Sequence, residues 1–144
     1  MILDTTYLLP LSGISVDVDL LRSIVEGRVP LDLNDLKVSL ISLFELQAKA
    51  AKLSIPAERV VKAVDAIERA FTVVPFTIPE IIEISFSLRK AFLKDYIDSV
   101  IAATAIVLKE PLVTEDKDIH SIAHVLEEKY RITVYSYDGL LHKT

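Results

Sequence analysis

The sequence contains no cysteine, only three glycines and only three histidines. The missing cysteines exclude disulfides, thiol catalysis, Cys-ligated zinc and iron–sulfur clusters, and they fit a reducing compartment. Neither a G-x-G-x-x-G pattern nor a P-loop occurs, so a glycine-rich phosphate loop is excluded. No H-E-x-x-H motif is present. His120 and His124 are spaced i, i+4, but no third ligand completes a zinc set with them.

Long apolar runs are also missing, since none reaches the ~18 residues of a membrane span. We do not expect the first residues to form a signal peptide, because no positively charged segment precedes the apolar run and Asp4 interrupts it. We therefore expect no membrane association and a cytoplasmic location.

Basic residues are in the minority, and the formal net charge is −5. This negative charge argues against tight nonspecific binding of nucleic acid. A nuclease could still bind its substrate if a bound metal ion neutralised the phosphate locally. A local basic patch is still conceivable, but each cation taken alone is better explained as a solvated helix surface. The candidates for such a patch are Lys49, Lys52, Arg89, Lys90 and Lys94.

The 144 residues are 51% hydrophobic and 26% charged, which indicates one globular domain over residues 1–144. Apolar patterning predicts strands at 1–3, 37–41, 72–77, 111–114 and 132–137. It predicts helices at 17–29, 42–53, 56–71, 79–92, 95–108 and 117–130. Pro75 places the third strand at an edge, and Thr77 with Glu80 forms a capping-box pattern. This alternation predicts an α/β fold with a parallel sheet covered by helices on both faces.

Four carboxylates lie against apolar runs: Asp4, Glu45, Asp98 and Asp116. Such acids are costly unless they pair with cations or bind a metal. Asp4 ends the first predicted strand and Asp116 follows the fourth. If these strands are neighbours, both acids flank one crevice at the carboxyl ends of the strands.

Converging carboxylates would form an oxygen-rich site for a hard divalent cation, which points to hydrolysis of a phosphate ester. The hydroxyls of Thr6 and Thr114 lie near the acids and are candidates to orient a carboxylate or a water. Asp118 is a further auxiliary candidate, in the first turn of the helix after Asp116.

Each acid also has a structural alternative. Glu45 could complete an S-x-x-E capping box with Ser42. Asp4 could begin a turn with the two following threonines. Asp95 rivals Asp98 on the same helical face, and we interpret it as an N-cap. Glu115 rivals Asp116, and we interpret it as solvated.

The segments ILDTTYLL, DSVIAATAIVL and LVTEDKDI resemble, in this order, the PIN-domain family and in particular the VapC-like toxins. The resemblance implies a three-layer α/β/α fold with a central parallel five-stranded sheet of order 3-2-1-4-5. It also implies a Mg²⁺- or Mn²⁺-dependent ribonuclease. Its four catalytic acids fall on Asp4, Glu45, Asp98 and Asp116, with Asp4, Asp98 and Asp116 on the metal. The sequence departs from the family pattern at Thr6, Lys109, Glu110 and Ile119.

The leading hypothesis is therefore a metal-dependent endoribonuclease, the toxin of a toxin–antitoxin pair, with an RNA substrate, a small antitoxin partner and a homodimeric state. The alternative is a catalytically inactive PIN-like module that binds a partner protein, which the broad apolar face of residues 78–92 favours. A receiver-like domain ranks last, because Asp4 lacks an adjacent acid. The tyrosines are expected in the core or an interface rather than as base-stacking platforms; they are Tyr7, Tyr96, Tyr130, Tyr135 and Tyr137.

Overall fold

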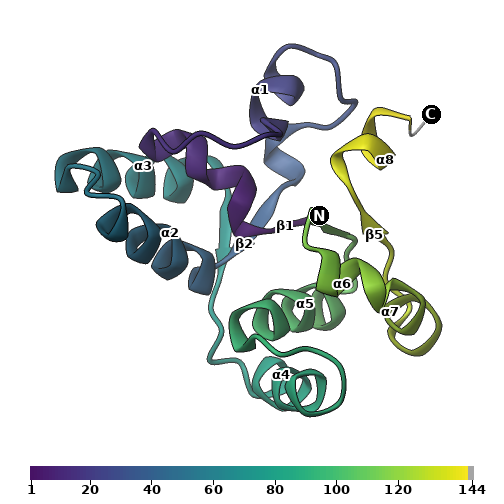
Figure 1. The fold of residues 1–144 in the computed structure, drawn as a ribbon. Helices are drawn as coiled ribbons and strands as arrows, with labels where there is room; N and C mark the ends of the chain where they lie inside the picture. Colours follow the sequence, from purple (N-terminus) through teal and green to yellow (C-terminus); the bar gives the residue numbers. More distant parts are fainter. Residues whose placement is uncertain (143–144) are drawn as a thin grey trace.

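The computed structural model describes residues 1–142, and its centre is a five-stranded parallel sheet (Figure 1). The strands are β1 (Ile2–Leu3), β2 (Lys37–Ser39), β3 (Thr72–Val74), β4 (Leu112–Val113) and β5 (Val134–Tyr135). Their order is β3-β2-β1-β4-β5, as the resemblance implied. β1 and β4 are therefore neighbours, with Leu3 in register with Val113.

Helices precede and follow these strands in the order that the apolar patterning predicts. The longer helices are α2 (Leu40–Lys52), α3 (Ala57–Ala70), α4 (Pro79–Ala91) and α5 (Tyr96–Leu108). The shorter ones are α1 (Leu20–Val25), α6 (Lys117–Ser121), α7 (Ala123–Tyr130) and α8 (Tyr137–Leu141). Two 3₁₀ segments, η1 (Thr5–Ser12) and η2 (Leu33–Asp35), complete the described elements.

The alternation of side chains along each strand builds one core on each face of the sheet. Leu3 and Val113 belong to a core with residues of η1, α1, α2, α3 and α8. Ile2 and Leu112 belong to the other core, with residues of α4, α5, α6 and α7. Figure 1 shows the two layers, with α2 and α3 together and α4 and α5 together on the other side. The three-layer α/β/α architecture is thus confirmed.

Helix α5 contains a strongly apolar run of the sequence, and every residue from Ser99 to Ile106 is buried. A helix surrounded by the core needs no polar face. Within residues 1–142, none of the helices is both long and apolar enough to cross a membrane.

The predicted capping boxes are wrong. Helix α2 begins earlier than expected, and Ser39 caps it by accepting from the backbone N–H of Ile41. Ser42 is therefore a buried residue inside the helix. Helix α4 has Ile78 at its N-cap without a side-chain hydrogen bond. Pro79 at the first helical position explains this start, since its fixed φ suits the helix and its missing N–H would be unpaired there anyway.

Other boundaries also differ from the predictions. The helix expected at 17–29 is reduced to α1, capped by Asp19. The helix expected at 117–130 is divided into α6 and α7 at Ile122. At this break the Ser121 hydroxyl donates to the carbonyl oxygen of Asp118 at 2.6 Å, a local bond that competes with the helical pattern. Neither the 3₁₀ segments nor α8 was predicted.

Candidate active site

A cavity of about 390 Å³ lies where β1 and β4 end. All four carboxylates singled out from the sequence line it. Its lining residues are Asp4, Thr6, Glu45, Lys49, Asp95, Asp98, Glu115 and Asp116. The neighbouring positions of β1 and β4 bring Asp4 and Asp116 together, as parallel-sheet topology predicts.

Asp4 is the most deeply buried of these acids, with 6% of its surface exposed. Its Oδ1 accepts from the backbone N–H of Thr5 at 2.7 Å, and its Oδ2 accepts from the Thr114 hydroxyl at 2.5 Å. Burial raises the pKa of Asp4, and the negative charges of Glu45 and Asp116 add to the increase. The two hydrogen bonds act in the opposite direction, because they stabilise the ionised carboxylate.

Asp98 lies in the first turn of α5. Asp95 is the N-cap, and its Oδ1 accepts from the backbone N–H groups of Ile97 and Asp98 at 2.7 and 3.3 Å. The cap interpretation of Asp95 is therefore confirmed, although Asp95 lines the cavity as well. The pKa of Asp98 is raised to about 7. Burial is the largest cause, and the nearby negative charges add to the increase; they belong to Asp116, Asp4, Asp95 and Glu45. Its carboxyl group changes protonation near neutral pH.

Asp116 is the N-cap of α6, where its Oδ1 accepts from the backbone N–H of Ile119 at 2.9 Å. Its own backbone N–H donates to the Thr114 hydroxyl at 2.9 Å. Thr114 is fully buried and therefore links Asp116 to Asp4. Asp118 is exposed and is not among the residues that line the cavity.

Glu45 and Lys49 reach the cavity from α2. They are four residues apart, so they lie on the same face of the helix. Helix α2 is held against η1 by a hydrogen bond from the Thr5 hydroxyl to the Ser42 hydroxyl at 2.9 Å. Lys49 is the one basic residue in the lining of this cavity.

Glu115 is exposed, as expected, but it also makes hydrogen bonds that the sequence did not predict. Its Oε2 accepts from the Tyr7 hydroxyl at 2.5 Å and from the backbone N–H of Tyr137 at 2.8 Å. Burial raises the pKa of Tyr7, and the bond to Glu115 raises it further, so Tyr7 stays a neutral donor. The only hint in the sequence is its place beside Asp116 at the end of a strand.

The lining supplies the carboxylate oxygens that a hard divalent cation such as Mg²⁺ or Mn²⁺ prefers. In residues 1–142, no three acidic or histidine side chains already lie close enough together to hold one ion. Mg²⁺ does not require that, because it is usually bound through one or two carboxylates together with waters and substrate phosphate. Like charges in one cavity repel one another, and a bound cation would relieve that repulsion. The donor chemistry therefore fits a divalent ion.

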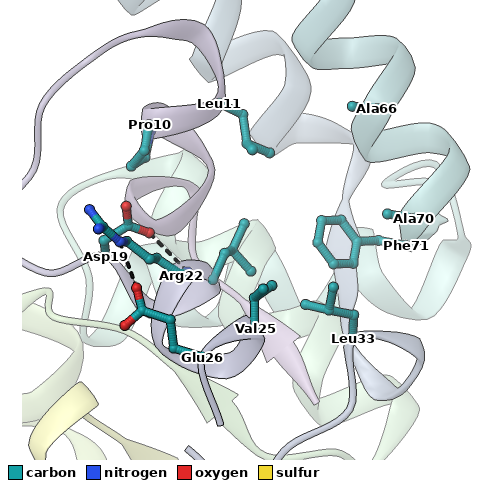
Figure 2. Close-up of a pocket in the computed structure, with 11 residues that line it drawn as sticks. Pro10, Leu11, Asp19, Arg22, Val25, Glu26, Leu33, Ala66, Ala70 and Phe71 are labelled. Carbon is teal, nitrogen blue, oxygen red and sulfur yellow. Dashed lines mark hydrogen bonds and ion pairs between the residues drawn. The ribbon is translucent and has the colours of Figure 1, made fainter. Parts of the chain in front are cut away.

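A second cavity, of about 440 Å³, is apolar and shares no residue with the acidic one. Figure 2 shows Leu11, Val25, Leu33 and Phe71 directed into it, between η1, α1, η2 and the end of α3. At its rim, the Nε of Arg22 donates to Glu26 at 2.8 Å. These apolar walls offer no group for hydrolytic chemistry.

Comparison with known proteins identifies the class of this chain. The family model described as "PIN domain" matches residues 1–125. The chain therefore belongs to the PIN domain family, and the resemblance noted in the sequence is confirmed. The search of curated proteins gave no match.

Several solved structures share the fold. A chain of a toxin–antitoxin complex from Klebsiella pneumoniae has 23% identity and a TM-score of 0.64, over 84% of this chain and 91% of that one. FitAcB from Neisseria gonorrhoeae has 20% identity and a TM-score of 0.66, over 97% and 100%. VapBC2 from Rickettsia felis, bound to a promoter DNA fragment, has 19% identity and a TM-score of 0.62, over 94% and 96%. At these identities the likeness shows the fold.

Proposed function

We propose that this protein is a metal-dependent endoribonuclease that hydrolyses RNA phosphodiester bonds. The observation that carries the proposal is the meeting of Asp4, Glu45, Asp98 and Asp116 in one cavity at the ends of β1 and β4. Membership of the PIN domain family supports it, because PIN proteins are generally nucleases that use divalent metal ions.

Asp4, Asp98 and Asp116 would hold Mg²⁺ or Mn²⁺, directly or through water. The bound ion would supply positive charge against the phosphate and would lower the pKa of a water molecule. The Thr114 hydroxyl donates to the buried Asp4 and so favours its ionised form, against the effect of burial. Glu45 and Thr6 line the same cavity, where Glu45 would orient the attacking water and Thr6 would offer a hydroxyl. Binding of the cation would favour the ionised form of Asp98, whose pKa is raised to about 7 without it.

We further propose that the protein is the toxin of a toxin–antitoxin pair, controlled by a small antitoxin protein. The solved structures that share its fold support this, since one is described as a toxin–antitoxin complex. The same proposal includes a homodimer in the cytoplasm.

The activity is tested by incubating the purified protein with Mg²⁺ or Mn²⁺ and an end-labelled RNA. We expect internal cleavage that EDTA abolishes. Asp4→Asn and Asp98→Asn should each reduce the rate at least a hundredfold, whereas Glu127→Gln, an exposed change on α7, should not. Cleavage that persists in Asp4→Asn would show that this cavity is not the active site.

A PIN-like module that only binds a partner protein is the second candidate. The observation in its favour is apolar exposure on two helices, with Phe44 on α2 60% exposed and Phe86 on α4 65% exposed. Isothermal titration with Mn²⁺ separates the candidates. Absence of both binding heat and RNA cleavage would favour the binding module.

A further inference from the structure

Two exposed aromatic side chains, one from the middle of α4 and one from the start of α5, meet where these helices pack together. The rings of Phe86 and Tyr96 have centroids 5.7 Å apart and an interplanar angle of 85°, an edge-to-face contact. Phe86 is 65% exposed and Tyr96 is 40% exposed. Of the two places expected for Tyr96, the core or an interface, its exposure excludes the core. The edge-to-face arrangement fixes the rings against each other while leaving a large part of both in solvent.

The start of α5, which carries Tyr96, borders the acidic cavity, although neither ring is among the residues that line it. Tyr96 is the first residue of α5, between Asp95 and Asp98, and both of these acids line the cavity. Phe92, which ends α4, is 40% exposed in the same turn. A chain that enters the cavity over the start of α5 would pass these rings.

Three cations lie at the same turn. Arg89 and Lys90 occupy the last turn of α4, and Lys94 lies between α4 and α5. All three are exposed, and none takes part in the ion pairs found among residues 1–142. In a protein with a net charge of −5, this is a local basic surface beside an acidic cavity. Lys49 adds a cation within the cavity wall.

We propose that the α4–α5 turn binds the single-stranded RNA segment that flanks the cleaved phosphate. Bases stack on Phe86 and Tyr96, and Arg89, Lys90 and Lys94 contact the neighbouring phosphates. Aromatic platforms combined with a basic track are how proteins bind single strands without sequence readout. The inference rests on the proposed nuclease function and adds the surface that holds the RNA beside the cavity.

A second copy of the chain fits this surface less well. A twofold interface brings a patch against the same patch of the partner. The three cations would then approach their own counterparts, which disfavours association. Phosphate groups, in contrast, complement their charge.

The test measures RNA binding separately from cleavage. A fluorescein-labelled single-stranded 12-mer RNA is titrated with the protein in EDTA and followed by fluorescence anisotropy. The variants are Phe86→Ala/Tyr96→Ala and Arg89→Gln/Lys90→Gln/Lys94→Gln. The matched control is Val61→Ala/Lys62→Gln, one apolar and one basic change on the exposed surface of α3.

We expect each variant to raise the Kd at least about fivefold, and the control to leave it unchanged. The triple variant should also lower the slope of log K against log salt concentration by about 2, since three phosphate contacts are lost. With 2-aminopurine in the RNA, the wild type should quench its fluorescence, and the aromatic variant should lose the quenching. Sedimentation should give all variants the wild-type mass.

Variants that bind and cleave RNA like the wild type would overturn this inference and leave the proposed function intact. The inference also fails if the variants only convert a dimer to a monomer, or if the wild type does not bind the 12-mer. If the wild type binds the 12-mer through this surface but does not cleave it with Mg²⁺ or Mn²⁺, the proposed function fails and the binding surface stands.

Discussion

Thr114 joins the ends of two neighbouring strands through a single hydroxyl group, which donates to Asp4 at 2.5 Å. The same oxygen accepts from the backbone N–H of Asp116 at 2.9 Å. Thr114, which directly follows β4, thus orients the carboxylate of Asp4 and also holds the backbone of Asp116. The relation between the two carboxylates depends on this one side chain.

Replacing Thr114 with valine keeps the branched shape but removes the hydroxyl. We expect the free energy of unfolding to fall by about 1–3 kcal/mol, because a buried carboxylate and a backbone N–H each lose a partner. The pKa of Asp4 should rise further, since the Thr114 bond lowers it. Urea unfolding gives the stability, with Thr114→Ser as the control that retains the hydroxyl. Equal stability of the valine and serine variants would contradict this role.

The raised pKa of Asp98 makes the metal-free protein less stable at higher pH. Between the ordinary value of 3.8 and about 7, the folded state retains a proton that the unfolded state has released. Stability should therefore decrease as pH rises through this window and level off above it.

Asp98→Asn removes this contribution, so it should stabilise the metal-free protein at pH 8 and have little effect near pH 4. The gain is on the order of 1 kcal/mol, because the half-buried carboxyl is partly screened by solvent. Urea unfolding in EDTA across this pH range measures the difference. A gain that is the same at both pH values would argue against a raised pKa as its source.

Divalent cations should relieve the repulsion among the cavity carboxylates and so stabilise the folded protein. We expect Mn²⁺ at a hundred times its Kd to stabilise the wild type by about 2.7 kcal/mol, because only the folded state assembles the site. Asp4→Asn and Asp116→Asn should lose most of this shift in thermal unfolding. Glu127→Gln is the charge-matched control and should retain it. A full shift in Asp4→Asn would place the cation elsewhere.

Lys109 ends α5 in the left-handed conformation, with φ 55° and ψ 44°. Glycine adopts this conformation without the steric cost of a Cβ atom. Lys109→Gly should therefore raise the free energy of unfolding by up to about 1 kcal/mol. Lys62→Gly, in the middle of α3, should lower it by about 1 kcal/mol. If Lys109→Gly instead lowers the free energy of unfolding, the lysine side chain stabilises the fold by more than its left-handed backbone costs.

Much of this fold follows from local pattern. Short apolar runs predicted β1 to β5, and helical spacing predicted α2 to α5 with few errors. The acids Asp4, Glu45, Asp98 and Asp116 stood out because charge beside an apolar run demands an explanation. The family resemblance implied that the first and fourth strands are neighbours, and in a parallel sheet such neighbours bring Asp4 and Asp116 to one crevice.

The sequence by itself determined the layers of the fold and the candidate acids, because periodicity and burial cost are local properties. Tertiary structure alone decided that Glu115 meets Tyr7, 108 positions away, and that Asp95 lines the cavity while capping α5. It also decided that Ser39, and not Ser42, caps α2. Such contacts depend on how distant backbone segments are positioned in three dimensions, and no pattern of neighbouring residues records that arrangement.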